Sequence, residues 1–405
     1  MAPVPAPASG SGPVPRRAPY AGPVQAYLDH AATTPLRPEA LAAMLPYLTE
    51  HFGNPSGSHR LARRARVALD EARQEIADCL GCEPGEVVCT SGGTESDNLA
   101  VLGARGAVLC SAVEHHAVRN ACAAAGGATV GVLPSGTIDL DALAAALGPH
   151  VGLVSVMLAN NEVGTVQPLA EVAAVVRAGA PQALVHTDAV AAVGWLDVAA
   201  AAAPADLVSV SAHKFGGPKG VGALVVRDGT PLSAVLHGGA QERGRRPGTH
   251  DVAGVVGMAA ALRVATERRT GEVERVGALR DRLADGLRAA VPGLRETGVG
   301  PGSGAGGGAG SPDRSAKVAS SCHVHVPGVE QEELLLLLDQ AGVCASGGAA
   351  CASGALEPSH VLAAMGLDPA VARSAVRFSL GYTSTAAEVD HVLGVMPKVV
   401  DQLRA

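Results

Sequence analysis

Aromatic side chains and an excess of positive charge are what this 405-residue chain lacks. Phe, Trp and Tyr make up only 2% of the residues although 47% are hydrophobic, so the core must be built mostly from Ala, Val and Leu. The formal net charge is −7 at pH 7. Proteins that bind nucleic acid or anionic membrane surfaces present basic patches. The acidic balance therefore argues against direct binding to nucleic acid or to a membrane surface.

Long apolar runs and a cysteine framework are missing as well. The most alanine-rich stretch, residues 189–203, is short and is interrupted by Asp197, so we expect no membrane span. The eight cysteines are scattered along the chain, which is typical of reduced thiols and predicts a cytoplasmic location. Cys79 and Cys82 form a C-x-x-C, but no second pair of ligands is spaced to match it, so we expect no metal site.

Composition divides the chain into an arm and two domains. Residues 1–26 contain seven prolines with Ala, Gly and Ser, which predicts a disordered arm. Strand-like and helix-like segments then alternate, which predicts a large α/β domain over residues 27–269 with a mainly parallel sheet. Its seven expected strands are residues 87–90, 107–110, 129–133, 153–158, 183–187, 207–210 and 223–226.

The pattern changes after residue 254. Long helices are expected to about residue 291, and a Gly/Ser/Ala tract at 298–312 predicts a flexible surface loop. Further strand-like and helix-like segments follow, so we predict a smaller α+β domain over residues 270–405. The first residues after the arm are candidates to pack on this smaller domain.

A lysine at the end of an expected strand is the first candidate for catalysis. The apolar run 207–210 leads into Ser211, His213 and Lys214, and a glycine-rich turn follows. Most lysines are solvated surface charges. An amine that is desolvated at a strand end, beside a hydroxyl and an imidazole, can instead become a nucleophile. We therefore predict that Lys214 forms a Schiff base with an aldehyde cofactor.

A glycine turn after another expected strand predicts an anion site. Thr90 is followed by Ser91, Gly92, Gly93 and Thr94, and then by a helix. Free backbone N–H groups and the helix dipole favour an anion at such a position. An ordinary helix N-cap is the alternative, but a phosphorylated cofactor would need this kind of site.

Polar side chains also follow three other expected strands. Asp188 is either a helix cap or the carboxylate that keeps a pyridine nitrogen protonated. His115 is either structural or a group that stacks on an aromatic cofactor and transfers protons. Asn161 and its neighbours supply amides to a polar pocket. Near an amine and a phosphate site, we favour the functional interpretation of each.

Cys351 lies in the small-residue run ASGGAACASG. Buried cysteines are usually inert packing groups. A thiol on a glycine-rich loop is exposed and can travel, which favours a nucleophilic role.

Taken together, these residues closely resemble the cysteine desulfurases of the NifS and IscS type. These are pyridoxal-phosphate enzymes of the class V aminotransferase family, with the aspartate-aminotransferase fold (fold type I). The likeness extends from Tyr27 to about Val392. Its motifs are YLDHAATTP from Tyr27, GNPSGSH from Gly53, TSGGTESDN from Thr90, EHHAV from Glu114, NNEVG from Asn160, HTDAV from His186, SAHKFGGPKGVGAL from Ser211, HGGAQERGRRPGT from His237, ASGGAAC and LEPSHVL around Cys351, and VRFSLG from Val376.

The resemblance implies a role for each of these residues. Lys214 would be the Schiff-base lysine, Asp188 the partner of the pyridine nitrogen, His115 the stacking acid–base group and Cys351 the thiol that receives sulfur. The phosphate would be held by Gly93, Thr94, Ser211 and His213, and by Thr249 reaching across a homodimer into the neighbouring subunit's site. Asn161 and Arg377 would bind the substrate carboxylate, Arg377 through bidentate hydrogen bonds.

Two features depart from the family pattern. Ala191 stands where the family usually has a glutamine that donates to the phenolic oxygen of the cofactor, so we expect an altered proton affinity of the cofactor linkage. The chain also ends at Ala405, without the longer tail with which some relatives bind an iron–sulfur scaffold. The resemblance therefore does not extend to that partner.

The implied reaction converts L-cysteine to L-alanine and leaves a persulfide on Cys351, which then passes sulfur to an acceptor protein. Iron–sulfur assembly and the thiolation of tRNA or of metabolites all draw on such a persulfide, so the acceptor stays open. A selenocysteine lyase, an aminotransferase of the same fold, and a catalytically impaired scaffold that binds partners are the alternatives.

Overall fold

The computed structural model describes residues 26–300, 312–347 and 359–405. The predicted N-terminal arm (except Ala26), most of the Gly/Ser/Ala tract and Cys351 lie outside these residues. In the part of the chain that is described, no helix combines the length and the apolar character that a bilayer crossing requires.

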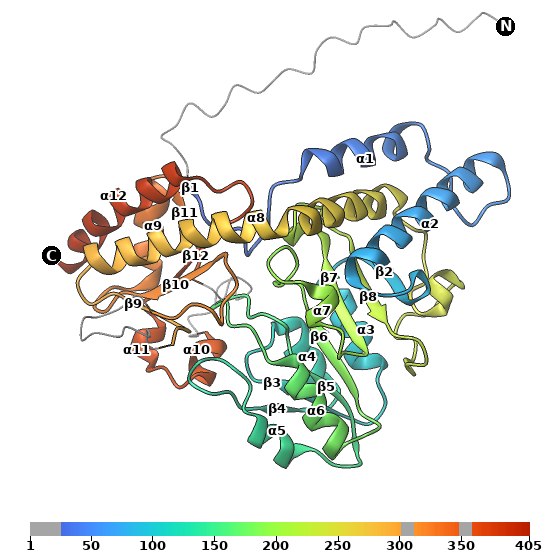
Figure 1. Ribbon diagram of the computed structural model, residues 1–405, viewed down its shortest axis with the longest axis horizontal. Coiled ribbons are helices and arrows are strands. Elements are labelled where there is room, and N and C mark those ends of the chain that lie inside the picture. Colours follow the sequence, from blue (N-terminus) through green and yellow to red (C-terminus); the bar gives the residue numbers. More distant parts are fainter. Residues whose placement is uncertain (1–25, 301–311, 348–358) are drawn as a thin grey trace, which may run out of the picture.

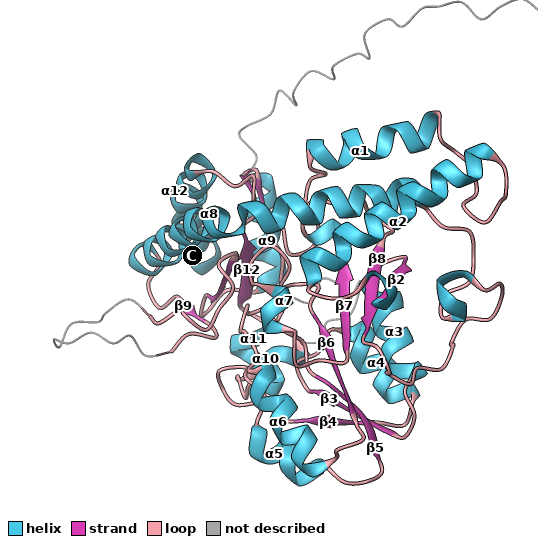
Figure 2. Ribbon diagram, turned by 45° about the vertical axis from the view of Figure 1, so that its right-hand side comes forward, coloured by secondary structure: helices cyan, strands magenta, loops and turns pink. Residues whose placement is uncertain are grey.

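The seven-stranded sheet, the largest among the described residues, confirms the predicted α/β fold (Figures 1 and 2). Its strand order is β2-β8-β7-β6-β5-β3-β4, and every pair is parallel except those that β8 makes with β7 and β2. Buried strands of such sheets read as continuous apolar runs, which is why they were recognisable in the sequence. The strands are β2 (Val87–Thr90), β3 (Ala107–Ser111), β4 (Ala128–Val130), β5 (Val151–Ser155), β6 (Leu184–Asp188), β7 (Leu207–Ser211) and β8 (Gly222–Val226).

Helices cover both faces of this sheet (Figure 2). The helix α2 shows why they form where they do: His59 caps its first turn by accepting from the Ala62 N–H, and Gly81 ends it with a left-handed backbone at φ 65°. The helices of this part are α1 (Pro38–Thr49), α2 (Arg60–Leu80), α3 (Gly93–Gly103), α4 (His116–Ala124), α5 (Leu140–Ala146), α6 (Leu169–Gly179) and α7 (Val198–Ala201), with short 3₁₀ turns η1 (Pro84–Glu86), η2 (Ala212–Lys214) and η3 (Gln241–Gly244).

The C-terminal part is a smaller α+β unit. An antiparallel sheet has the order β12-β10-β9, and β1 pairs in parallel with β11. The first described residues therefore pack on this unit. Its elements are β1 (Ala26–Tyr27), β9 (Arg295–Glu296), β10 (Ser321–His325), α9 (Gln331–Gln340), β11 (Val343–Cys344), α10 (His360–Ala364), α11 (Pro369–Ala372), β12 (Ala375–Ser379) and α12 (Ala386–Arg404).

One long helix, α8 (Val252–Ala290), joins the two units. The sequence predicts several helices here, but the structure has one that runs along both units (Figure 1). Met258 and Leu262 belong to the core around the large sheet, whereas Val276 and Leu283 belong to the core of the smaller unit. We therefore propose that the domain boundary near residue 270 lies within α8 rather than in a linker.

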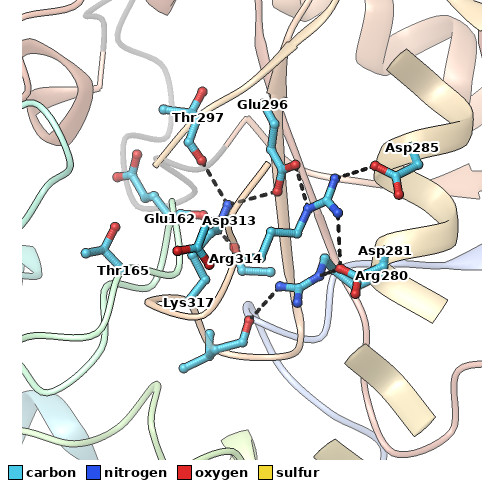
Figure 3. Close-up of polar contacts among 12 residues, drawn as sticks. Glu162, Thr165, Arg280, Asp281, Asp285, Glu296, Thr297, Asp313, Arg314 and Lys317 are labelled. Atoms are coloured by element: carbon cyan, nitrogen blue, oxygen red, sulfur yellow. Dashed lines mark hydrogen bonds and ion pairs between the residues drawn. The ribbon is translucent and has the colours of Figure 1, made fainter. Parts of the chain in front are cut away.

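A cluster of charged residues holds residues 314–317 against β9 and α8 (Figure 3). The Lys317 ammonium is buried, donates to the Thr297 carbonyl at 2.8 Å and pairs with Glu296. Arg314 also pairs with Glu296, at 2.8 Å, and with Asp285 on α8.

The segment that these cations hold, residues 314–318, lies against residues 164–166. The Val166 N–H donates to the Ala316 carbonyl at 2.9 Å, and the Val318 N–H donates to the Gly164 carbonyl at 2.9 Å. The cluster thereby fixes the loop that begins with Asn161.

Glu242 in η3 is a buried hub of the large unit. Its carboxylate accepts two hydrogen bonds from Arg73, at 2.8 and 2.6 Å, and one each from His250 and the Cys89 N–H. Burial alone raises the pKa of Glu242, but the bonds from His250 and Arg73 outweigh burial and bring this pKa to about 2.

Replacing Glu242 with Gln should lower the free energy of unfolding by roughly 3 kcal/mol at pH 7, because removing one partner of a buried pair leaves the Arg73 charge uncompensated. The folded-state pKa lies below the unfolded value of 4.5, so this stabilisation is present above about pH 4.5 and is lost as the pH falls towards 2. Urea unfolding at pH 7 and pH 3 measures both effects.

Asp70→Asn is the matched control, because Asp70 forms an exposed pair with Arg66 and its loss should cost about 0.5 kcal/mol or less. Equal losses in the free energy of unfolding for the Glu242 and Asp70 variants would show that the interactions of Glu242 stabilise the fold no more than an exposed ion pair does.

Candidate active site

A cavity of about 290 Å³ lies at the carboxyl ends of β6 and β7, where ligands bind in parallel α/β sheets. The structure brings nine of the residues singled out from the sequence into its walls. They are Gly93, Thr94, His115, Asn161, Asp188, Ser211, His213, Lys214 and Arg377. Its walls thus include the ends of β6 and β7, the starts of α3 and α4, the N-terminal segment at Ala31 and Ala32, and β12 of the smaller unit.

Lys214 enters the cavity from η2, directly after the buried strand β7. Its Nζ donates to the carbonyl oxygens of Ala31 and Ala32, the latter at 3.0 Å. Thr34 ties this N-terminal segment to η2, because its N–H and hydroxyl both donate to the His213 carbonyl, at 3.0 and 2.8 Å. The amine is therefore held at a fixed place by backbone carbonyls.

The start of α3 can hold an anion. Gly92 occupies the N-cap with φ 146° and makes no side-chain cap, so no side chain blocks the first N–H groups of the helix. A Cβ at Gly93 would meet the Val190 side chain at 2.8 Å, which explains the need for glycine. Thr94 and Ser211 add hydroxyls to the same wall.

Buried carboxylates form the floor of the cavity. Asp188 is 4% exposed and accepts from the Val190 N–H at 2.8 Å. Burial raises the pKa of Asp188, although His115 and Lys214 act in the opposite direction. Asp97 is 1% exposed, and its Oδ1 has no hydrogen-bond partner among the described residues. Burial, with Asp188 next, holds the pKa of Asp97 well above its usual range.

His186 lies within 3.7 Å of this orphaned oxygen of Asp97. Its ring nitrogens contact the hydroxyls of Ser155 at 2.8 Å and Ser209 at 3.0 Å. Burial lowers the pKa of His186 to about 3, so the imidazole is neutral. Burial therefore disfavours the charged forms of Asp97 and Asp188, and a bound cationic ring nitrogen would favour them.

His115 is oriented by its own helix. As the N-cap of α4, it accepts from the Ala117 N–H through Nδ1 at 3.2 Å. Burial lowers the pKa of His115, with Asp188 acting against it. Because Nδ1 is an acceptor, the proton of the neutral ring sits on Nε2, which can exchange it with a ligand in the cavity.

Arg377 comes from β12 of the smaller unit and is 2% exposed. Its guanidinium donates to the Asn161 carbonyl at 2.9 Å and to the Asp29 carboxylate at 2.8 Å. Sequence reasoning missed Asp29 and Asp97 as site residues. Both lie within motifs of the resemblance, and that position was the signal that could have identified them.

Two other predicted residues are not placed in this cavity. Thr249 is exposed and does not line it. Cys351 lies outside the described residues. Ser359, the next described residue after it, donates to the buried Glu162 carboxylate at 2.5 Å, and the neighbouring His360 contacts the Glu114 carbonyl at 2.9 Å. Residues 359 and 360 are therefore anchored to Glu162 and to the Glu114 backbone.

Asp188→Asn should stabilise the protein when no cofactor is bound. Burial raises the folded-state pKa above the unfolded value of 3.8, so the wild type loses stability as the pH rises above about 4, and asparagine removes this loss. We expect a higher free energy of unfolding than that of the wild type at pH 8, and no difference at pH 3. Urea unfolding measures it.

Asp78→Asn, at an exposed position of α2, provides the control and should change stability little at either pH. A loss of stability in Asp188→Asn at pH 8 would mean that the folded protein already compensates the buried charge.

Comparison with known proteins agrees with this geometry. The model of the aminotransferase class-V family matches residues 26–392. A protein named cysteine desulfurase from Cereibacter sphaeroides is 46% identical, with 94% of this chain and 96% of the relative covered. Among solved structures, a NifS-like protein superimposes with a TM-score of 0.84 at 31% identity, covering 94% of this chain and 100% of that one.

A second solved structure, described as SspA in complex with cysteine, has a TM-score of 0.74 at 30% identity and covers 89% of this chain and 100% of that one. These likenesses span the sheet, α8 and the smaller unit alike. The chain therefore belongs to the aminotransferase class-V family, among the cysteine desulfurases of the NifS and IscS type.

Proposed function

We infer that this protein is a pyridoxal-phosphate-dependent cysteine desulfurase. It takes the sulfur of L-cysteine, releases L-alanine and passes the sulfur through a Cys351 persulfide to an acceptor. The observation that carries the inference is a single cavity that combines an amine, a buried acidic floor, a helix N-terminus and a buried arginine. The full-length likeness to proteins named cysteine desulfurase supports it.

The described residues fit pyridoxal phosphate. The open start of α3, with Thr94 and Ser211, suits the phosphate. A protonated pyridine nitrogen fits beside Asp188, whose pKa is raised by burial, and near the Asp97 oxygen that has no hydrogen-bond partner among the described residues. When bound, the cofactor supplies an aldehyde that links to an amine and a ring that accepts electrons from the substrate.

The chain's own residues then bind the substrate and move its protons. Arg377 and Asn161 bind the carboxylate of cysteine, and Asp29 keeps the guanidinium of Arg377 in place. The amine of Lys214 can accept the proton from the substrate α-carbon. His115 can donate or accept a proton through Nε2, because its Nδ1 is engaged by the Ala117 N–H.

Cys351 takes the sulfur. Its thiolate attacks the sulfur of the substrate, the carbon–sulfur bond breaks with its electron pair staying on carbon, and a proton then completes alanine. Glu162 supports this step indirectly, because its carboxylate fixes Ser359, and Ser359 also caps α10. The identity of the final sulfur acceptor is not part of the proposal, and a cytoplasmic location stays a prediction from cysteine usage.

Borohydride reduction of the cofactor-loaded protein, followed by peptide mass spectrometry, should locate a pyridoxyl group on Lys214. Lys214→Ala should carry none. Cys351→Ser should keep the linkage but release alanine from cysteine, in the presence of a thiol, at least about 100-fold more slowly, because its nucleophile is missing. Alanine release is measured by amino-acid analysis.

Cys344→Ser is the matched control, since Cys344 lies on β11 and outside the cavity. It should release alanine at the wild-type rate. Undiminished release by Cys351→Ser would contradict the sulfur-transfer role, and a protein that forms no linkage at Lys214 would contradict the cofactor.

We also propose that the protein is a homodimer in which Thr249 of each subunit reaches the cofactor phosphate of the other. Helix α1 exposes Leu41, Leu45 and Leu48 at helical spacing, with exposed fractions of 51%, 55% and 59%. Phe52 follows at 73%. An apolar face of this kind usually marks an interface, and a second copy is the occupant that also explains an exposed Thr249.

Light scattering should give twice the chain mass for the wild type. Leu45→Glu combined with Leu48→Glu should give monomers, because two carboxylates would be buried without partners. Thr249→Ala should weaken cofactor binding even though Thr249 does not line the cavity of its own chain.

Leu336→Glu, at a leucine of α9 that is 59% exposed, should leave the mass unchanged. A wild-type protein that runs as a monomer while it binds the cofactor at full affinity would refute the shared site.

A further inference from the structure

A second, smaller cavity lies behind Ala191. It has a volume of about 30 Å³, and its walls include His30, Ala191, Lys214 and Ser320. Ala191 and Lys214 line the larger cavity as well, so the two spaces adjoin at these side chains. Alanine has no atoms beyond Cβ, and it therefore leaves this space open towards Lys214. The volume is enough for roughly one or two water molecules.

His30 is the unexplained polar group of this cavity. It is 4% exposed, and neither ring nitrogen has a hydrogen-bond partner among the described residues. Buried polar side chains almost always have a partner in the protein or in ordered water. A water molecule in the adjoining space would satisfy the ring.

The imidazole is held in one place by its surroundings. The backbone N–H of His30 donates to the Ser379 carbonyl at 3.1 Å. The Tyr27 ring packs against the imidazole edge-on at 4.9 Å. Gly381 approaches so closely that a Cβ there would lie 2.1 Å from the His30 Nδ1. The ring therefore cannot turn away to find another partner.

The charge state of His30 suits a water-holding role. Burial lowers the pKa of His30 to about 4. The ring is therefore neutral at pH 7 and offers one N–H donor and one acceptor nitrogen. The hydroxyl of Ser320 and the amine of Lys214 supply further polar groups in the same walls, which gives a water the two to four partners it needs.

We propose that His30 holds a water molecule in this cavity and that the water donates a hydrogen bond to the phenolic oxygen of the cofactor, beside its linkage to Lys214. His30 is then a positioning residue, since it acts through the water. This inference rests on the proposed function, because it assumes that Lys214 carries the cofactor. It goes further by concerning the pKa of the nitrogen that links Lys214 to the cofactor, which the overall reaction leaves undetermined.

The expected consequence has a definite sign. A hydrogen bond donated to the phenolic oxygen withdraws electron density from the adjoining linkage, so it disfavours protonation of the linked nitrogen. Losing the water should therefore raise the pKa of that nitrogen. Among the described residues, His115 in front of α4, Asp188 at the end of β6 and His213 in η2 also interact electrostatically with Lys214. None of the three lines the smaller cavity among the described residues.

The test is an absorbance titration of the resting, cofactor-loaded protein, which reads the pKa of the linkage without turnover. His30→Phe should raise this pKa by about one unit, the size expected for one hydrogen bond to a charged group. Ala191→Gln places an amide donor at the cavity itself. In that background, His30→Phe should shift the pKa by less than about a third of a unit, because the water is no longer required.

His323→Phe is the matched control. His323 is fully buried, and both its nitrogens also lack partners among the described residues, but it lies on β10 and lines neither cavity. It should leave the linkage pKa unchanged. Should His30→Phe fail to fold, His30→Leu gives the same comparison with a smaller side chain.

Equal shifts for His30→Phe with and without Ala191→Gln, or no shift at all, would overturn the proposal while leaving the proposed function intact. A wild-type protein that shows no linkage absorbance with pyridoxal phosphate would instead overturn the proposed function. A crystal structure of the loaded wild type should show the water within hydrogen-bond distance of His30, and a cavity without such a water there contradicts the inference.

Discussion

Burial of negative charge is the constraint on which this site depends. Asp188 and Asp97 lie beneath the cavity, both almost without access to solvent, and a buried carboxylate is costly unless a cation compensates it. The chain supplies Lys214 and His115 nearby, yet the pKa of Asp188 stays raised by its burial. We propose that a cation arriving with the cofactor compensates these carboxylates, and that the unliganded fold carries the cost, as functional sites often do.

The arrangement of the two units serves the same cavity. Helix α8 is shared by both hydrophobic cores, and the cluster of Lys317, Arg314 and Glu296 holds the smaller unit against residues 164–166. Arg377 can then reach the cavity from β12, where it bonds to the carbonyl of Asn161. The groups that we propose to bind the substrate thus come from both units, and the distance between them is fixed by contacts remote from the cavity.

Much of this could be predicted from the sequence because the signals are local. Apolar runs predicted the strands, and a glycine turn before a helix singled out Gly93 and Thr94, which line the cavity at the start of α3. That they bind an anion stays a prediction. What was missed is non-local. The single helix α8 replaced the expected series, and it packs on both hydrophobic cores. Asp97 became a floor residue only through the neighbouring β6 and β7, and His30 reached Ala191 only because the N-terminal segment pairs with β12.

The sequence by itself determined the fold class, the order of the motifs and the chemical identity of the lysine, aspartate, histidine and arginine, since side-chain type and local backbone preference are written along the chain. The tertiary structure alone decided which groups lie together and how far each is buried from solvent. Both determine the protonation state of each group. Burial and the distance between charges arise from contacts between residues far apart in sequence, and these set the pKa of a carboxylate or an imidazole more strongly than its own neighbours in the chain do.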